Sequence, residues 1–134
     1  MPLDLASLIP LDKFETCKAE RLVALGYPAV EPVLPELLEW TQDGNWPVAR
    51  IFLPFLASIG MPMEPHLRSV FQTDDNQWKY FLLVNIVDES RELARALVQD
   101  LRRFVESPTN GEVAEGLNTI ANELLGKYCG DAEA

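Results

Sequence analysis

The stretch that decides the fold is GYPAVEPVLPELLEWTQDGNW at residues 26–46, because residues 60–78, GMPMEPHLRSVFQTDDNQW, follow the same plan. Each stretch opens with a glycine and a proline that stop a helix, continues with prolines suited to a first helical turn, and ends in an Asp-containing turn before a tryptophan. The opening glycines are 34 positions apart, and the closing tryptophans, Trp46 and Trp78, are 32 apart. A repeat of this length is typical of helical-hairpin arrays.

The segments that follow the two tryptophans have apolar residues at helical spacing. After Trp46 the template i, i+3, i+4, i+7 is matched by Val48, Ile51, Phe52, Phe55, Leu56 and Ile59. Pro54 lies inside this segment and is expected to bend the helix. The segment 78–87 is apolar nearly all round, which is typical of a buried helix. Because no segment alternates with a period of two residues, the predicted fold class is all-α.

Capping residues predict where the helices begin. Asp12 starts the first helix, Asn45 caps the helix after the first repeated turn, and Asp74 or Asp75 caps the helix at Trp78. Thr109, followed three residues later by a glutamate, predicts a capping box for the last helix. Whether residues 76–105 form one helix or two is left open.

We therefore expect a single all-α domain over residues 1–134, built as a short HEAT-like α-α superhelix. Its predicted parts are three stacked helical hairpins at residues 12–42, 45–72 and 75–105 and a closing helix at residues 109–129. Such hairpins bury their apolar faces only by stacking, which produces a curved array with one concave face. An irregular closed bundle is the competing arrangement.

The charge of the chain restricts its partners. With 11 basic and 21 acidic residues, the formal net charge is -10. Nucleic acids and anionic lipid surfaces require clustered cations, so we predict that the protein binds neither. A basic protein is the partner that this charge favours. The first residues have neither a basic start nor a long apolar run, so we expect a cytoplasmic location.

The sequence has no recognisable catalytic or metal-binding motif. Cys17 and Cys129 are 112 positions apart, and His66 is the only histidine, so no zinc framework can be written. A lone histidine also lacks the second group that usually orients a general base. There is no phosphate-binding glycine loop and no nucleophile elbow. We therefore predict a protein that is not an enzyme and that has no cofactor and no metal ligands.

The candidate functional residues lie at the two repeated turns, because equivalent turns of a stacked array share one edge. They are Asp43, Asn45, Trp46, Asp74, Asp75, Trp78, Lys79 and Tyr80. Tryptophans beside carboxylates and amides can form a protein-binding surface. A purely structural role competes with this hypothesis, since Asp and Asn cap helices and a tryptophan in a first turn packs between helices.

The whole pattern resembles a family of small bacterial domains of unknown function. The resemblance rests on Leu25-Gly26-Tyr27-Pro28, the run 32–40 (PVLPELLEW), the run 45–49 (NWPVA) and Trp78-Lys79-Tyr80. It implies an α-α superhelix of the HEAT or armadillo kind and implies no activity, cofactor or catalytic residue.

Our leading hypothesis for function is a non-enzymatic protein-binding module, one version of which is an immunity-type inhibitor of a basic toxin. The alternative is a carboxylate-based enzyme, metal-dependent in one form, with its site near Asp43, Asp74 and Asp75. A HEAT-like base-excision protein would need a basic groove, which this acidic chain does not readily supply.

Overall fold

The computed structural model describes residues 4–130, and every regular element within that range is helical. The α-helices are α1 (Thr16–Leu25), α2 (Leu34–Glu39), α3 (Pro47–Ile59), α4 (Glu64–Phe71), α5 (Asn76–Asn85), α6 (Arg91–Ala96), α7 (Val98–Glu106), α8 (Asn110–Ala114) and α9 (Leu117–Leu124). Shorter helical turns are η1 (Leu5–Leu8), η2 (Glu31–Val33), η3 (Met61–Met63), η4 (Val87–Glu89) and η5 (Leu125–Cys129). The predicted all-α fold class is confirmed.

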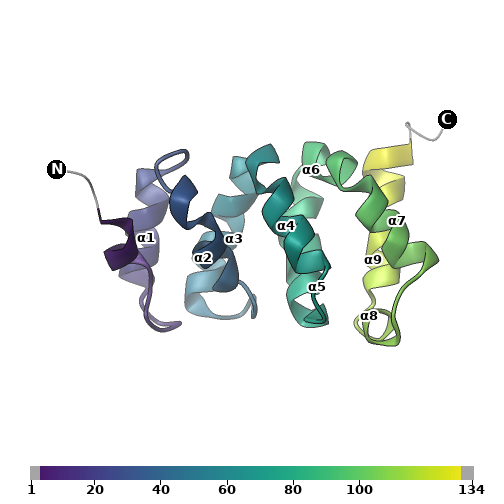
Figure 1. Ribbon diagram of the computed structural model, residues 1–134, viewed down its shortest axis with the longest axis horizontal. Coiled ribbons are helices and arrows are strands. Elements are labelled where there is room, and N and C mark those ends of the chain that lie inside the picture. Colours follow the sequence, from purple (N-terminus) through teal and green to yellow (C-terminus); the bar gives the residue numbers. More distant parts are fainter. Residues whose placement is uncertain (1–3, 131–134) are drawn as a thin grey trace.

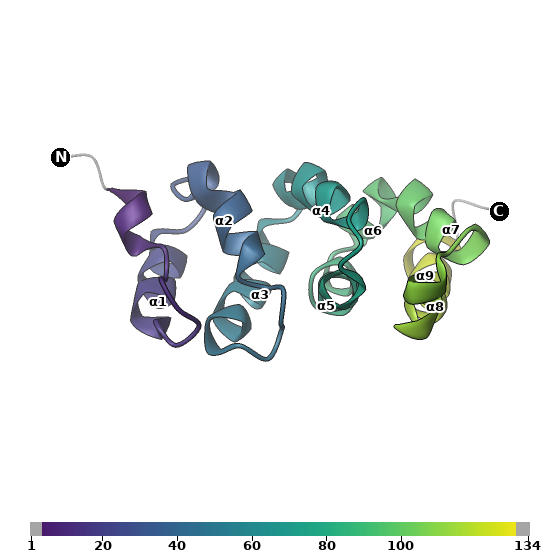
Figure 2. The same ribbon diagram turned by 60° about the horizontal axis from the view of Figure 1, so that its bottom comes forward.

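The helices form an elongated row with α1 at one end and α7 and α9 at the other (Figure 1). Turning the molecule shows two layers, with α2, α4 and α6 in one layer and α1, α3 and α5 in the other (Figure 2). In the second layer α1 packs on α3, α3 on α5 and α5 on α9. At the C-terminal end of the row, α7 packs against α9.

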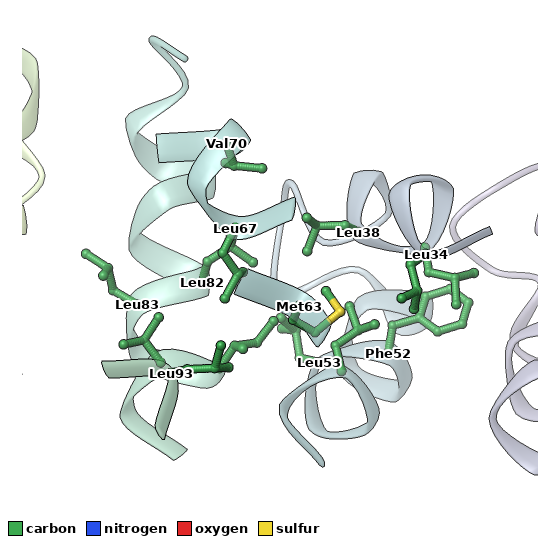
Figure 3. Packing of buried hydrophobic residues seen from close by; sticks show 14 of the residues in the cluster. Leu34, Leu38, Phe52, Leu53, Met63, Leu67, Val70, Leu82, Leu83 and Leu93 are labelled. Carbon is green, nitrogen blue, oxygen red and sulfur yellow. The ribbon is translucent and has the colours of Figure 1, made fainter. Parts of the chain in front are cut away.

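A continuous apolar core fills the space between the layers (Figure 3). Leu34 and Leu38 of α2 face Phe52 and Leu53 of α3 across this space, and Met63 of η3 lies between the neighbouring helices. Phe52 and Met63 are completely buried. Each buried side chain of this size contributes about 1.5–3 kcal/mol relative to an exposed one, so contact between the layers is what stabilises these short helices.

Glycines in the left-handed region end the helices where the sequence predicts it. Gly26 has φ 74° and follows α1, and Gly60 has φ 79° and follows α3. Glycine has no Cβ and adopts this conformation without the usual steric cost. Gly116, with φ 77°, breaks the region predicted as one closing helix into α8 and α9, so that prediction of a continuous helix is wrong.

Two predicted helix starts are also wrong. The carboxylate of Asp12 accepts a hydrogen bond from the Phe14 N–H (2.8 Å) and shapes a turn, so that α1 begins only at Thr16. Asn45 does not cap α3, because Trp46 is the residue at the helix boundary, and the Asn45 N–H donates to the Asp43 carboxylate (2.8 Å) in the preceding turn. Side chains of this kind compete for backbone groups in turns as readily as at caps.

Residues 76–105, for which the sequence leaves open one helix or two, form several separate helices. The α-helix α5 ends at Asn85, and η4 follows it. Ser90 then adopts an extended conformation, and its hydroxyl accepts a hydrogen bond from the Leu93 N–H (3.2 Å). This cap starts α6 in a new direction.

Candidate protein-binding edge

The connections from α2 to α3 and from α4 to α5 lie at the same edge of the row, at the bottom of Figure 1. We call residues 41–46 and 72–78 together the turn edge. Its two parts are joined by the indole Nε1–H of Trp78, which donates to the Thr41 hydroxyl (3.0 Å). A β-carbon at Gly44 would overlap the Phe81 ring of α5. The first turn is therefore packed directly against the helix that follows the second turn.

In the first turn, hydrogen bonds hold Asp43, Asn45 and Trp46 in a fixed arrangement. The Asp43 carboxylate accepts from the Asn45 N–H, and the Asp43 carbonyl accepts from the Trp46 N–H (3.0 Å). The Trp46 side chain is half-buried, and its ring meets the Trp40 ring in a T-shaped contact with centroids 5.8 Å apart. Such aromatic pairs stabilise each other by about 0.5–1.5 kcal/mol beyond their buried area.

In the second turn, Asp75 has the capping role predicted for Asp74 or Asp75. Its carboxylate accepts from the Trp78 N–H (3.0 Å), while Asp74 is exposed and its side chain forms no hydrogen bond within residues 4–130. The Trp78 side chain is half-buried, so part of the indole reaches the surface. Tyr80 is also half-buried, and its ring lies edge-on to Phe81.

Lys79 does not lie on the surface, in contrast to its place in the predicted binding group. It is only 3% exposed, and its ammonium donates to Glu112 (2.8 Å) and Asn76 (3.1 Å). The reason is its helical position, which points the side chain toward α7 and α8 and away from solvent. Lys79 therefore joins α5 to α8 and is not part of an exposed recognition surface.

The partner of Lys79, Glu112, is the most strongly shifted acid of the described chain. Burial raises the pKa of its carboxyl, but hydrogen bonds from Arg103, from Lys79 and from the Thr109 N–H outweigh that effect and lower the pKa from 4.5 to about 2. Thr109 and Glu112 also form the capping box that the sequence predicts. This network is structural, because the Glu112 side chain is 1% exposed.

A small pocket that the sequence does not predict lies at the turn edge, and we call it the indole pocket. It has a volume of about 230 Å³ and is lined by Glu39, Trp40, Gln42 and Trp46. The sequence does not predict Trp40 or Glu39 as a site residue, because both lie at the end of α2 and before the turn at residues 41–46. The available signal was the pair of tryptophans six positions apart, with a tight turn between them.

The remaining chemically reactive side chains are scattered. His66 lines a proline-rich groove of about 580 Å³ between α2 and α4, and its side chain forms no hydrogen bond in the described part of the chain. Cys17 is exposed and Cys129 is buried, and both are free thiols. Within residues 4–130, no three His, Cys, Asp or Glu side chains come together in a way that could hold a metal ion. In the same range, no helix has the length and apolar character needed to cross a bilayer.

Together these features define an all-α protein of two helical layers, with an edge of carboxylates and half-exposed indoles. The chain belongs to the family described as Domain of unknown function (DUF5071), whose model matches residues 8–125. No curated protein gives a significant match to the chain.

Proposed function

We propose that this chain is a non-enzymatic protein-binding module that holds a basic protein at the turn edge. The observation that carries the proposal is the pair of half-buried tryptophans, Trp46 and Trp78, beside carboxylates at one edge of the row. A fully buried indole could not contact a partner, but both Trp46 and Trp78 are only half-buried. Aromatic side chains of this kind supply large contact areas with little loss of side-chain entropy.

The electrostatics of the edge support a cationic partner. Asp43, Asp74 and Asp75 form no ion pair with any residue in the range 4–130, so their charges are not neutralised by the described chain. The chain as a whole carries a formal net charge of -10. Complementary charge of this kind accelerates association and selects partners more than it strengthens the final complex. For the same reason, nucleic acids and anionic membranes are disfavoured as partners.

The proposed binding module has a particular fold, cellular location and biological role. The scaffold is a HEAT-like or armadillo-like superhelix, in which repeated hairpins present equivalent turns along one edge. The setting is the bacterial cytoplasm. The more specific role is that of an immunity-type inhibitor, which would bind a basic toxin through the acidic edge and neutralise it.

The test compares proteins retained from a native lysate by the immobilised chain and by two matched variants. In the edge variant, Asp43→Asn is combined with Asp74→Asn, which leaves the Asp75 cap intact. In the control variant, Glu20→Gln is combined with Glu123→Gln, since both glutamates are exposed and lie away from the turn edge. The two variants lose the same charge, so a difference between them reports on the edge alone.

The proposal predicts a basic protein that is retained by the native chain and by the control variant, released at high salt, and lost from the edge variant. That protein is then purified and titrated against all three chains by calorimetry. Retention of no protein at low salt, or equal affinity of a retained protein for both variants, would contradict the proposed binding edge. Inhibition of the retained protein's toxicity would establish the more specific role.

A further inference from the structure

The indole pocket contains an unusual combination of side chains for an exposed turn. Trp40 and Trp46 present ring planes inclined at 67° to each other, so the pocket is bordered by two aromatic systems in different orientations. Glu39 is exposed at the same pocket, and Gln42 is half-buried there. The pocket thus brings together two π systems, one carboxylate and one amide.

This combination favours a cation over a neutral or anionic ligand. The face of an aromatic ring is electronegative, and a cation within about 6 Å of its centroid is attracted, most strongly by tryptophan. The Glu39 carboxylate adds its full charge and has no ion-pair partner within residues 4–130. An amide such as that of Gln42 can accept a hydrogen bond from an N–H donor.

No cation of the described chain is recorded over either indole. The cation–π contacts within residues 4–130 involve other rings, with Lys13 over Phe14, Lys79 and Arg103 over Phe104, and Lys127 over Tyr128. Arg50 is the basic residue nearest to Trp46 in the sequence, one helical turn further along α3, and it is exposed. Trp40 and Trp46 therefore remain available for a cation from another molecule, and both line the indole pocket.

The size of the pocket indicates what carries that cation. Its volume of about 230 Å³ lies below the roughly 300–1,000 Å³ of pockets that enclose drug-sized ligands. It suits one side chain and is small for a cofactor. We infer that the indole pocket binds a single lysine or arginine side chain presented by the protein partner. This inference rests on the proposed function and identifies the contact by which the turn edge would recognise a basic protein.

The direct test uses small probes and the indole N–H signals of the chain, which has three tryptophans. Nα-acetyl-lysine-N-methylamide and Nα-acetyl-arginine-N-methylamide are titrated into ¹⁵N-labelled protein until the signals stop moving. The signals of Trp40 and Trp46 are expected to shift together, and Trp78 is expected to shift least because its N–H is bound to Thr41. The Nε-acetylated lysine probe has the same backbone and no charge, and it is expected to cause no saturable shift.

Variants assign the effect to particular side chains. Trp46→Phe keeps an aromatic ring at the α3 boundary and is expected to weaken probe binding by about 2- to 5-fold, in line with the strength of an exposed cation–π contact. Glu39→Gln is expected to weaken it by about 1.5- to 5-fold. Glu36→Gln removes the same charge from α2 at an exposed residue that does not line the pocket, and it is expected to leave the affinity unchanged. Dispersed amide spectra of all three variants verify folding before titration.

The outcomes separate this inference from the proposed function. Equal shifts with charged and Nε-acetylated lysine probes, or equal loss of affinity in Glu39→Gln and Glu36→Gln, would overturn the cation pocket. If the pocket fails this test while a basic protein still depends on Asp43 and Asp74, the proposed function stands and the contact lies elsewhere on the turn edge. If the pocket binds the probes but no protein is retained, the proposed function fails and the pocket remains a cation site.

Discussion

The buried network around Glu112 offers the sharpest test of how α5, α7 and α8 are held together. Glu112→Gln keeps the size of the side chain and a residue type that also completes a capping box, so the change removes essentially one thing, the negative charge. Lys79, which is 3% exposed, then keeps only the neutral Asn76 oxygen and the new amide as acceptors. Arg103 loses its charged partner as well, although it is 38% exposed and can be solvated.

Two independent estimates give the size of the effect. Removal of one partner from a buried ion pair usually costs about 3–5 kcal/mol, because the other charge is left without compensation. The lowering of the Glu112 pKa from 4.5 to about 2 corresponds to roughly 3 kcal/mol of interaction that favours the charged form in the folded state. We therefore expect Glu112→Gln to reduce the free energy of unfolding at pH 7 by about 3 kcal/mol, a large share of the 5–15 kcal/mol typical of a domain.

The pH dependence gives a signature that a simple packing defect would lack. Because the folded-state pKa lies below the unfolded-state value, the stabilisation by Glu112 is complete above about pH 4.5 and is lost as the pH falls toward 2. Urea unfolding of the native chain and of Glu112→Gln at a series of pH values should show a gap in stability that narrows over this window. The matched control is Glu115→Gln, an exposed carboxylate in the same region, which should stay within about 0.5 kcal/mol of the native chain.

The opposite partner provides a check of the reasoning. Lys79→Met leaves Glu112 bound by Arg103 and by the Thr109 N–H, so its cost should be smaller, about 1–3 kcal/mol. A gap between the native chain and Glu112→Gln that is the same at pH 7 and near pH 2 would refute the electrostatic explanation. So would a larger loss for Lys79→Met than for Glu112→Gln.

Three further substitutions test the packing and capping of the turn edge. Gly44→Ala should lower the free energy of unfolding, measured in urea, by about 1–3 kcal/mol, because the new methyl group would overlap an aromatic ring of α5. The control is Gly126→Ala, whose methyl group meets nothing within 4 Å and should change the free energy of unfolding little. Asp75→Ala should lower the free energy of unfolding, measured by thermal unfolding, by about 1 kcal/mol because the helix loses its cap. An equal decrease for Asp74→Ala, at the exposed neighbouring residue, would contradict the capping role of Asp75. Thr41→Val should lower the free energy of unfolding by about 1–3 kcal/mol and accelerate hydrogen exchange at the indole N–H of Trp78, which donates to the Thr41 hydroxyl. An unchanged exchange rate would show that this hydrogen bond contributes little to stability.

Local features of the fold were predictable where one residue type has one strong conformational preference. Gly26 and Gly60 end helices because glycine adopts positive φ at little cost, and Thr109 begins a helix because its hydroxyl matches a free N–H. Predictions failed where an aspartate carboxylate binds a backbone N–H in a turn before the helix. Asp12 accepts from the Phe14 N–H and Asp43 accepts from the Asn45 N–H, and neither Asp12 nor Asn45 caps the helix predicted for it.

For the candidate site, the sequence indicated the turns and the tertiary structure determined the roles of their side chains. Trp46 and Trp78 reach the surface in part, as a binding edge requires, whereas Lys79 is buried by its ion pair with Glu112, 33 positions away. Trp40 was overlooked because its contact with Trp46 depends on how the intervening turn folds back.

The amino-acid sequence alone determined the helical fold class, the helix-ending glycines and the negative charge, because each depends on residue type or on neighbours within a few positions. Only the tertiary structure decided which tryptophans share a pocket, which lysine is buried and which carboxylates form no ion pair within residues 4–130. Those properties depend on contacts between helices that are distant in the chain. Such contacts form only when the apolar faces of the helices have packed into a common core.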